Sequence, residues 1–237
     1  TLIFMVGIIG AMTEELEALL ADLQDRHDAK HGPFTLHSGT LEGKQVLLAQ
    51  CGIGKVNAAA LTQLMILQNV TEIIFTGVAG GVDATLEVGD IVISTDAMQH
   101  DSDVRALGYK LGEVPGETLS WQADVGLLES AFTAAKTIEG INVIKGRILS
   151  GDQFIASPEK VKELRETFQG ACAEMEGAAV AQICSKWQVP FVIIRSISDN
   201  ADHDAKVNFR EFTPLAAVRA KQVVRGMLKK RGMGNEE

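Results

Sequence analysis

The chain has 237 residues, of which 46% are hydrophobic, and carries a formal net charge of -9. This acidic balance argues against nucleic acid or an anionic membrane surface as a partner, because both require clustered basic residues. No apolar run reaches the ~20 residues that cross a bilayer, and the first residues lack the basic segment and cleavage site of a signal peptide.

The three cysteines, Cys51, Cys172 and Cys184, are odd in number and far apart in the sequence. This pattern is typical of reduced thiols that pack as small hydrophobic side chains. Together with the missing signal-peptide pattern, it leads us to expect a cytoplasmic protein.

Hydrophobic periodicity and turn residues divide the chain into strands and helices. In chain order, we predict a strand at 2–9, a helix at 13–23, hairpin strands at 34–40 and 45–50, a helix at 56–68, strands at 72–76 and 90–96, a helix at 125–138, a strand at 142–150, a helix from Pro158, a helix at 175–187, a strand at 190–196 and a helix at 214–230. Thr13 and Ser157 are the expected N-caps of the first and fourth helices. The glycine-rich stretch 77–81 is interpreted as a turn where backbone approaches a small ligand.

This alternation, with one early hairpin, predicts an α/β fold in which helices flank a central mixed β-sheet as a three-layer sandwich. No linker, repeat or low-complexity run interrupts the pattern, so residues 1–237 are expected to form a single domain. Residues 98–122 form an irregular segment that is too long for an ordinary connection. Such segments usually carry function or lie at an interface.

Several apparent motifs fail on inspection. The segment 52–55 resembles a P-loop, but Ala49 stands where the first glycine is needed and Val56 where Ser or Thr is needed. The clusters at 100–103 and 202–204 lack a calcium-loop glycine and a distal His or Cys ligand. We therefore interpret both clusters as solvated loops and expect neither a metal nor a cofactor.

Three carboxylates remain as candidates for chemistry. The strand at 190–196 delivers Asp199 to the carboxyl edge of the sheet, where ligands bind in open α/β folds. Glu15 follows the first strand, and Glu176 opens a helix just before the strand of Asp199. Singly, each has an ordinary interpretation as a first-turn or capping acid. Apolar neighbours would desolvate the group, namely Met12, Phe154, Met175 and Phe209.

Collinear motifs extend this set over nearly the whole chain. They occupy residues 7–15, 52–56, 89–92, 100–101, 108–109, 150–152, 154–155, 174–176 and 195–199. In these motifs the chain resembles the 5′-methylthioadenosine/S-adenosylhomocysteine nucleosidases of the nucleoside phosphorylase/hydrolase superfamily. The resemblance implies cofactor-free hydrolysis of an N-glycosidic bond, which releases adenine and a 5-thio-substituted ribose. It also implies a homodimer and a role in methionine salvage.

The resemblance also implies residue roles. Asp199 would protonate adenine N7, Glu15 would act as general base on the attacking water, and Glu176 would hold the ribose hydroxyls. Arg195 would help to place the water. Further contacts to the substrate would come from Ser198, Phe154, Ile155, Val78, Ala79, Gly80, Met12, Ile53, Met175 and Phe209, and, from the second copy of a dimer, Val104, Leu107, Tyr109 and Pro115.

One position departs from the family pattern. Val78 stands where many members have a serine whose hydroxyl helps to hold water or ribose, so its loss shifts that task to Glu15 and Arg195. Asp199 needs a raised pKa to act as an acid near neutral pH, whereas Glu15 must be ionised to accept a proton. Two carboxyl groups with separated pKa values are the general pattern of glycoside cleavage.

Two other functions stay open. A phosphorylase on the same fold would need Arg side chains or clustered N–H groups for phosphate, and Glu15 would repel that anion. A non-catalytic nucleoside-binding protein is suggested only by Val78. The preference among 5′-modified adenosines is not determined by the sequence.

Overall fold

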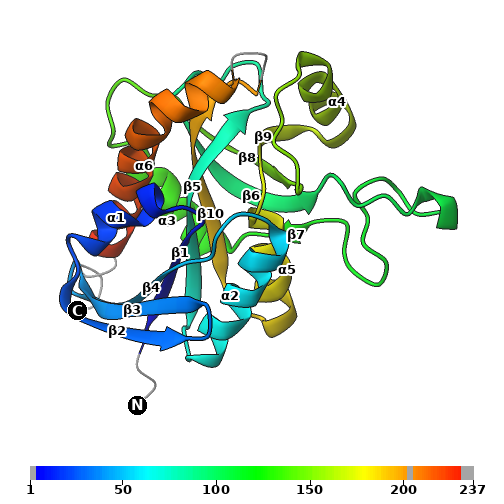
Figure 1. The fold of residues 1–237 in the computed structure, drawn as a ribbon. Coiled ribbons are helices and arrows are strands. Elements are labelled where there is room, and N and C mark those ends of the chain that lie inside the picture. The colour runs from blue at the N-terminus through cyan, green and yellow to red at the C-terminus, as the bar shows by residue number, and fades with distance from the viewer. Residues whose placement is uncertain (1–3, 202–204, 231–237) are drawn as a thin grey trace.

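The computed structural model describes residues 4–201 and 205–230 (Figure 1). Its elements are β1 (Val6–Gly10), α1 (Thr13–Leu20), β2 (Gln24–His31), β3 (Phe34–Leu41), β4 (Lys44–Gln50), α2 (Lys55–Leu67), β5 (Glu72–Gly81), β6 (Ile91–Gln99), the 3₁₀ turn η1 (Arg105–Leu107), β7 (Trp121–Gln122), α3 (Val125–Ala135), β8 (Val143–Ser150), α4 (Pro158–Phe168), β9 (Gly170–Glu174), α5 (Gly177–Trp187), β10 (Phe191–Asp199) and α6 (Ala205–Lys230).

The strands form one mixed sheet in the order β10-β6-β8-β9-β5-β1-β4-β3-β2, with β7 paired to β6. The central strands β1, β4, β5 and β10 run parallel, whereas β6 and β9 pair antiparallel with β10 and β5, respectively. Because β10 also pairs with β5, the strands from β5 to β10 close on themselves at this end of the sheet. The predicted mixed α/β sheet is confirmed.

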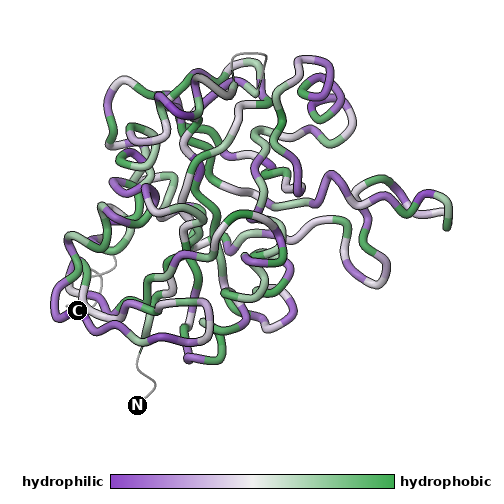
Figure 2. The backbone as a smooth tube through the Cα atoms, viewed as in Figure 1, coloured by the Kyte–Doolittle hydropathy of each residue, from purple (hydrophilic) through white to green (hydrophobic). Residues whose placement is uncertain are grey.

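Helices cover both faces of the sheet, which confirms the expected sandwich (Figure 1). One apolar cluster joins the sheet to α2 and α5, and a second joins it to α1, α3 and α6. Every residue of β1 and β10 is buried, because both faces of these strands are covered. The first four residues of β10 are accordingly a continuous apolar run rather than an alternating pattern. Figure 2 shows the resulting concentration of hydrophobic residues in the central strands.

Local signals gave most of the element boundaries correctly. The hairpin β3–β4 turns at Glu42 and Gly43, both with positive φ, as a tight two-residue turn requires. Ser157 caps α4 by accepting the N–H of Lys160. The prediction for Thr13 is wrong: Met12 is the N-cap of α1, and the N–H of Met12 is bonded by the Glu15 carboxylate.

Two strands and three element boundaries differ from the prediction. Strand β2 is polar and mostly exposed, and β9 consists of short side chains ending in Glu174, so neither has a strand-like hydrophobic pattern. Helix α6 begins at Ala205 and contains Pro214, which the sequence rule took as a helix start. Residues 77–81 are the last part of β5 and not a turn, and β10 extends to Asp199.

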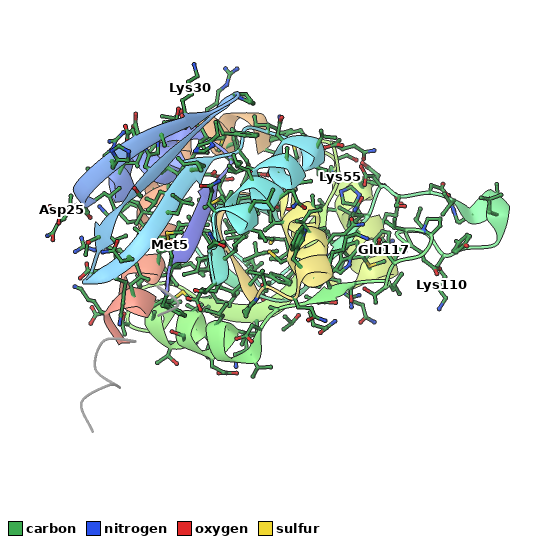
Figure 3. The ribbon with its side chains drawn as sticks, turned by 90° about the horizontal axis from the view of Figure 1, so that it is seen from below. Met5, Asp25, Lys30, Lys55, Lys110 and Glu117 are labelled. Atoms are coloured by element: carbon green, nitrogen blue, oxygen red, sulfur yellow. The ribbon has the colours of Figure 1, made fainter. Side chains whose placement is uncertain are left out.

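The irregular segment at 100–120, between β6 and β7, projects from the body of the protein, with Lys110 and Glu117 along it (Figures 1 and 3). The interpretation of 100–103 as a solvated loop is wrong at its start, because His100 is buried and Asp101 is ion-paired with Lys55. The second cluster, 202–204, lies outside the described residues.

The three cysteines are free and buried, as expected for small hydrophobic residues, and burial raises the pKa of each thiol. Within residues 4–201 and 205–230, no helix is both long enough and apolar enough to cross a membrane.

Candidate active site

A cavity of about 350 Å³ lies at the carboxyl ends of β1, β5 and β10, beside the start of α1 and the loop after β8. Its position is the one where parallel α/β sheets bind ligands. The lining residues are Ala11, Met12, Glu15, Ile53, Val78, Ala79, Gly80, Gln153, Phe154, Ile155, Ala173, Glu174, Met175, Glu176, Ser198, Asp199, Ala201 and Phe209.

Glu15 is held as a hydrogen-bond acceptor by three backbone donors. Its Oε2 accepts the N–H groups of Ala11 and Met12 at 2.5 and 2.8 Å, and its Oε1 accepts that of Val78 at 3.1 Å. The side chain is only 4% exposed. Burial raises its pKa above the ordinary value, while the positive charge of Arg195 and the three N–H groups oppose that shift.

Val78 contributes to this arrangement through its backbone. The N–H that binds Glu15 is independent of the side chain, so the change from serine to valine does not remove this contact. The Val78 side chain instead adds an apolar surface to the cavity.

Asp199 is the last residue of β10 and is 2% exposed. Its Oδ2 accepts the hydroxyl of Ser198 at 2.8 Å, and its Oδ1 accepts the N–H of Ala201, also at 2.8 Å. A Cβ on the neighbouring Gly80 would lie 3.0 Å from Oδ1, so the absence of a side chain there leaves room for the carboxyl group. Asp199 is therefore fixed in orientation at the cavity wall.

Glu176 lies at the N-cap position of α5 rather than inside the helix. Its Oε1 accepts the N–H of Gly54 at 2.8 Å, although the two residues are 122 positions apart. Burial and the nearby Glu174 carboxylate raise the pKa of Glu176 to about 8, against the lowering effect of the Gly54 N–H and of Arg195. This carboxyl group is therefore harder to ionise than an exposed glutamate.

Arg195 is not among the residues that line the cavity, and its help in placing the water stays a prediction. Its Nη2 is 2.6 Å from Oε2 of Glu174, and its guanidinium lies over the ring of Phe75, 4.0 Å from the centroid. It also donates to the backbone carbonyls of Phe75 and Ile194. Arg195 thus acts on Glu15 and Glu176 through its charge, from behind the cavity wall.

Aromatic residues form the apolar part of the cavity. The rings of Phe154 and Phe209 meet edge to face, with centroids 5.6 Å apart, although the two residues are far apart in the sequence. Phe154 is half exposed. An exposed ring at a cavity mouth offers a surface on which a planar base can stack.

The structure brings together most of the predicted site. The predicted residues that line the cavity are Met12, Glu15, Ile53, Val78, Ala79, Gly80, Phe154, Ile155, Met175, Glu176, Ser198, Asp199 and Phe209. The predicted residues that do not line it, apart from Arg195, are Val104, Leu107, Tyr109 and Pro115. These four belong to the projecting segment at 100–120, and their contribution from a second copy stays a prediction.

Sequence reasoning did not assign five lining residues, namely Ala11, Gln153, Ala173, Glu174 and Ala201. Glu174 had a visible signal, because it begins the Glu-Met-Glu motif. The small residues had none, since they line the cavity through backbone position alone. Within the described part of the chain, no group of three or more His, Cys, Asp or Glu side chains is arranged to hold a metal ion.

Comparisons with known proteins agree with this geometry. Residues 5–229 match the family described as the phosphorylase superfamily. A 5′-methylthioadenosine/S-adenosylhomocysteine nucleosidase from Halalkalibacterium halodurans is 45% identical, over 92% of this chain and 95% of that protein.

Two solved structures superpose closely. The nucleosidase of the same description from Neisseria meningitidis, in complex with methylthio-immucillin-A, has a TM-score of 0.92 at 42% identity, covering 95% of this chain and 99% of that one. Futalosine hydrolase of Helicobacter pylori has a TM-score of 0.91 at 33% identity, covering 96% and 98%. The fold is therefore shared by enzymes whose names give different substrates.

Proposed function

Because this chain belongs to the phosphorylase superfamily, we propose that it hydrolyses the N-glycosidic bond of 5′-methylthioadenosine and S-adenosylhomocysteine, releasing adenine and a 5-thio-substituted ribose. The observation that carries this proposal is the convergence of Glu15, Glu176 and Asp199 on one largely apolar cavity. A volume of about 350 Å³ lies within the usual range for small-molecule sites, ~300–1,000 Å³.

Asp199 is the proposed acid. It transfers a proton to adenine N7 while the bond between C1′ and N9 breaks and its electron pair goes to the base. Protonation neutralises the charge that the leaving base would otherwise carry, and such acid catalysis contributes roughly 10²–10⁴-fold. Ser198 and the N–H of Ala201 hold the carboxyl group in orientation for this transfer.

Glu15 is the proposed base. A water molecule attacks C1′ and gives a proton to the Glu15 carboxylate. Burial raises the pKa of Glu15, so its ionised form is a stronger base than an exposed carboxylate. Glu15 lies against Gly77 of β5 and Asp199 against Gly80. Those two backbone positions are three strand residues apart, about 10 Å. The proposed mechanism places the water and the base on opposite faces of the ribose.

Glu176 is the proposed ligand of the ribose hydroxyls. As the glycosidic bond breaks, positive charge develops on the ribose. Three buried carboxyl groups, those of Glu15, Glu174 and Glu176, surround this region, against the single guanidinium of Arg195. Where these carboxyl groups are ionised, their excess over the guanidinium favours a cationic sugar in the transition state.

Phosphorolysis is the weaker alternative on this fold. Among the described residues, neither Lys nor Arg lines the cavity, and Arg195 is already bonded to Glu174. A phosphate dianion would meet the carboxylate of Glu15 without a compensating cation. Water, which carries no charge, avoids this repulsion.

The 5′ substituent is proposed to lie near Met12, Ile53 and Phe209, at the open side of the cavity. Leu107 is 75% exposed and Tyr109 is 37% exposed, and both lie on the segment that projects from the body of the protein (Figure 1). We therefore propose a homodimer in which Val104, Leu107, Tyr109 and Pro115 complete the 5′ pocket of the other subunit. Recovery of the thio-sugar and adenine would suit cytoplasmic methionine salvage.

The test is product analysis by mass spectrometry with both thio-nucleosides, in the presence and absence of phosphate. We expect adenine and the free thio-ribose at a rate that does not depend on phosphate. A ribose 1-phosphate product would establish the phosphorylase alternative, and absence of turnover would favour a nucleoside-binding protein. Futalosine serves as a further substrate, because a futalosine hydrolase shares this fold.

A further inference from the structure

The position of Glu176 depends on a backbone N–H from a distant part of the chain. That donor is Gly54, the N-cap of α2, whose φ of +100° is a conformation that residues with side chains rarely adopt. A Cβ at Gly54 would also come within 3.2 Å of Oδ1 of Asp152. The Gly54 N–H can therefore meet Glu176 only while this unusual turn is held in place.

Asp152 holds the turn directly. Its Oδ1 accepts the N–H of Lys55, the first residue of α2, at 2.9 Å. A carboxylate at this position also interacts favourably with the positive end of the helix dipole. Asp152 immediately precedes the cavity-lining residues 153–155, so one side chain joins the loop beside the base to the turn that contacts Glu176.

Asp152 is itself held by the root of the projecting segment. Oδ2 of Asp101 accepts the N–H of Asp152 at 2.9 Å, and Oδ1 of Asp101 lies 2.7 Å from Nζ of Lys55. The same Nζ donates to Gln99 at 2.9 Å. The side chains of Lys55 and Asp101 are mostly buried, with exposures of 19% and 13%, whereas Asp152 is exposed. Although burial acts to raise it, the pKa of Asp101 is lowered because Lys55 and the Asp152 N–H stabilise its ionised form.

We propose that Asp152 is a positioning residue for the reaction: by bonding Lys55 and Asp101, it keeps the Gly54 N–H on the carboxylate that receives the ribose. This inference rests on the proposed function, because it assigns a cause to the state of Glu176 in that reaction. It also links the base of the projecting segment to the ribose site through the ion pair of Lys55 with Asp101.

The inference has a pH signature, because the proposed role of Glu176, to accept the ribose hydroxyls, requires its ionised form. The charged groups that act on Glu176 are Glu174, Arg195 and Glu15, and the Gly54 N–H lowers its pKa. Release of that N–H would raise the pKa of Glu176 further above about 8. The acid limb of kcat/KM would then move to higher pH, which simple loosening of a loop does not cause.

The experiment compares Asp152→Ala with Asp152→Asn in the full-length protein, using pH profiles of kcat/KM for 5′-methylthioadenosine. Asp152→Ala is expected to lower kcat/KM at about pH 7 on the order of tenfold, the range expected for one hydrogen bond to a charged group, and to move the acid limb upward. Asp152→Asn retains the oxygen that accepts the Lys55 N–H and should stay within about threefold of the wild type.

Asp124→Ala is the matched control. Asp124 caps α3 by accepting the N–H of Leu127 at 2.9 Å, so this variant removes a comparable helix-start bond that does not reach the cavity. It should lower thermal stability and leave the pH profile unchanged. Lys55→Met, which removes the ion pair with Asp101, provides a second variant and should shift the acid limb in the same direction.

An acid limb that stays at the wild-type pH in both Asp152→Ala and Lys55→Met overturns the inference, while wild-type turnover still supports the proposed function. Absence of adenine release by the wild-type enzyme would instead refute the proposed function. The two failures are therefore distinguishable in one series of measurements.

Discussion

The carboxylate of Glu15 occupies the space that a side chain at Gly77 would fill: a Cβ there would lie 2.4 Å from Oε1. Gly77 does not have a positive φ, so backbone conformation does not explain the glycine. The close approach of Glu15 explains it. Close approach likewise explains Gly80, where a Cβ would meet Ala201 and the Asp199 carboxyl group at 2.9 and 3.0 Å.

Gly77→Ala is expected to displace Glu15 and to lower kcat by about 10²-fold, because small displacements of a reacting group have effects of this size. Steady-state kinetics with 5′-methylthioadenosine measures this loss, and circular dichroism checks the fold. Gly81→Ala is the matched control in the same strand, since its Cβ would meet only ordinary contacts, the nearest at 3.5 Å. Equal kinetics for the two variants would contradict the assignment of Glu15 as the base.

Asp199→Asn is expected to lower kcat by roughly 10²–10⁴-fold while leaving nucleoside affinity largely intact. The amide keeps an oxygen for the N–H of Ala201 but cannot donate a proton to N7 as a carboxylic acid does. Calorimetric titration measures binding, and adenine release measures turnover. Asp83→Asn, in an exposed turn, serves as the control. Near-normal kcat in Asp199→Asn would show that another group is the acid.

Glu176→Gln is expected to change how stability depends on pH. The pKa of Glu176 is about 8 in the folded protein against 4.5 ordinarily, so the folded state binds more protons between these values. The wild type therefore loses stability as pH rises from about 4.5 to about 8, on the order of a few kcal/mol for this group. Urea denaturation at about pH 5 and pH 8 should show a smaller loss in Glu176→Gln.

Glu14→Gln is the control for that comparison, because Glu14 is exposed and the change removes a carboxyl group that is in contact with water. It should leave the difference in stability between the two pH values as in the wild type. If Glu176→Gln lost as much stability between the two pH values as the wild type, burial would not oppose ionisation of Glu176 in the folded state.

Leu107→Glu is expected to weaken the proposed homodimer and to raise KM for 5′-methylthioadenosine more than it lowers kcat. A charge on this exposed apolar side chain would have to be desolvated in an interface, whereas the catalytic carboxyl groups belong to the other subunit. Sedimentation velocity gives the oligomeric state. Leu215→Glu, on the exposed face of α6, is the control. A wild-type protein that sediments as a monomer with full activity would refute the dimer proposal.

Local sequence signals determined much of the architecture. Apolar runs predicted β1 and β10, turn residues predicted the β3–β4 hairpin, and the Ser157-Pro158 pair predicted the start of α4. Each of these depends on neighbouring residues only. Motif collinearity likewise indicated Glu15, Glu176 and Asp199 as candidate groups, because their residue types and order can be read directly from the chain.

Tertiary structure decided how these groups are held. The pairing of Arg195 with Glu174, the Gly54 N–H on Glu176 and the contact of Glu15 with Gly77 join residues 21, 122 and 62 positions apart in numbering. Such contacts depend on strand register and on the closure of β5 onto β10, which no local pattern encodes. The acidic groups of the site can therefore be identified from the sequence. Their burial, their pairing and the pH at which they ionise depend on all the neighbours that surround each group in space, and only the tertiary structure determines those neighbours.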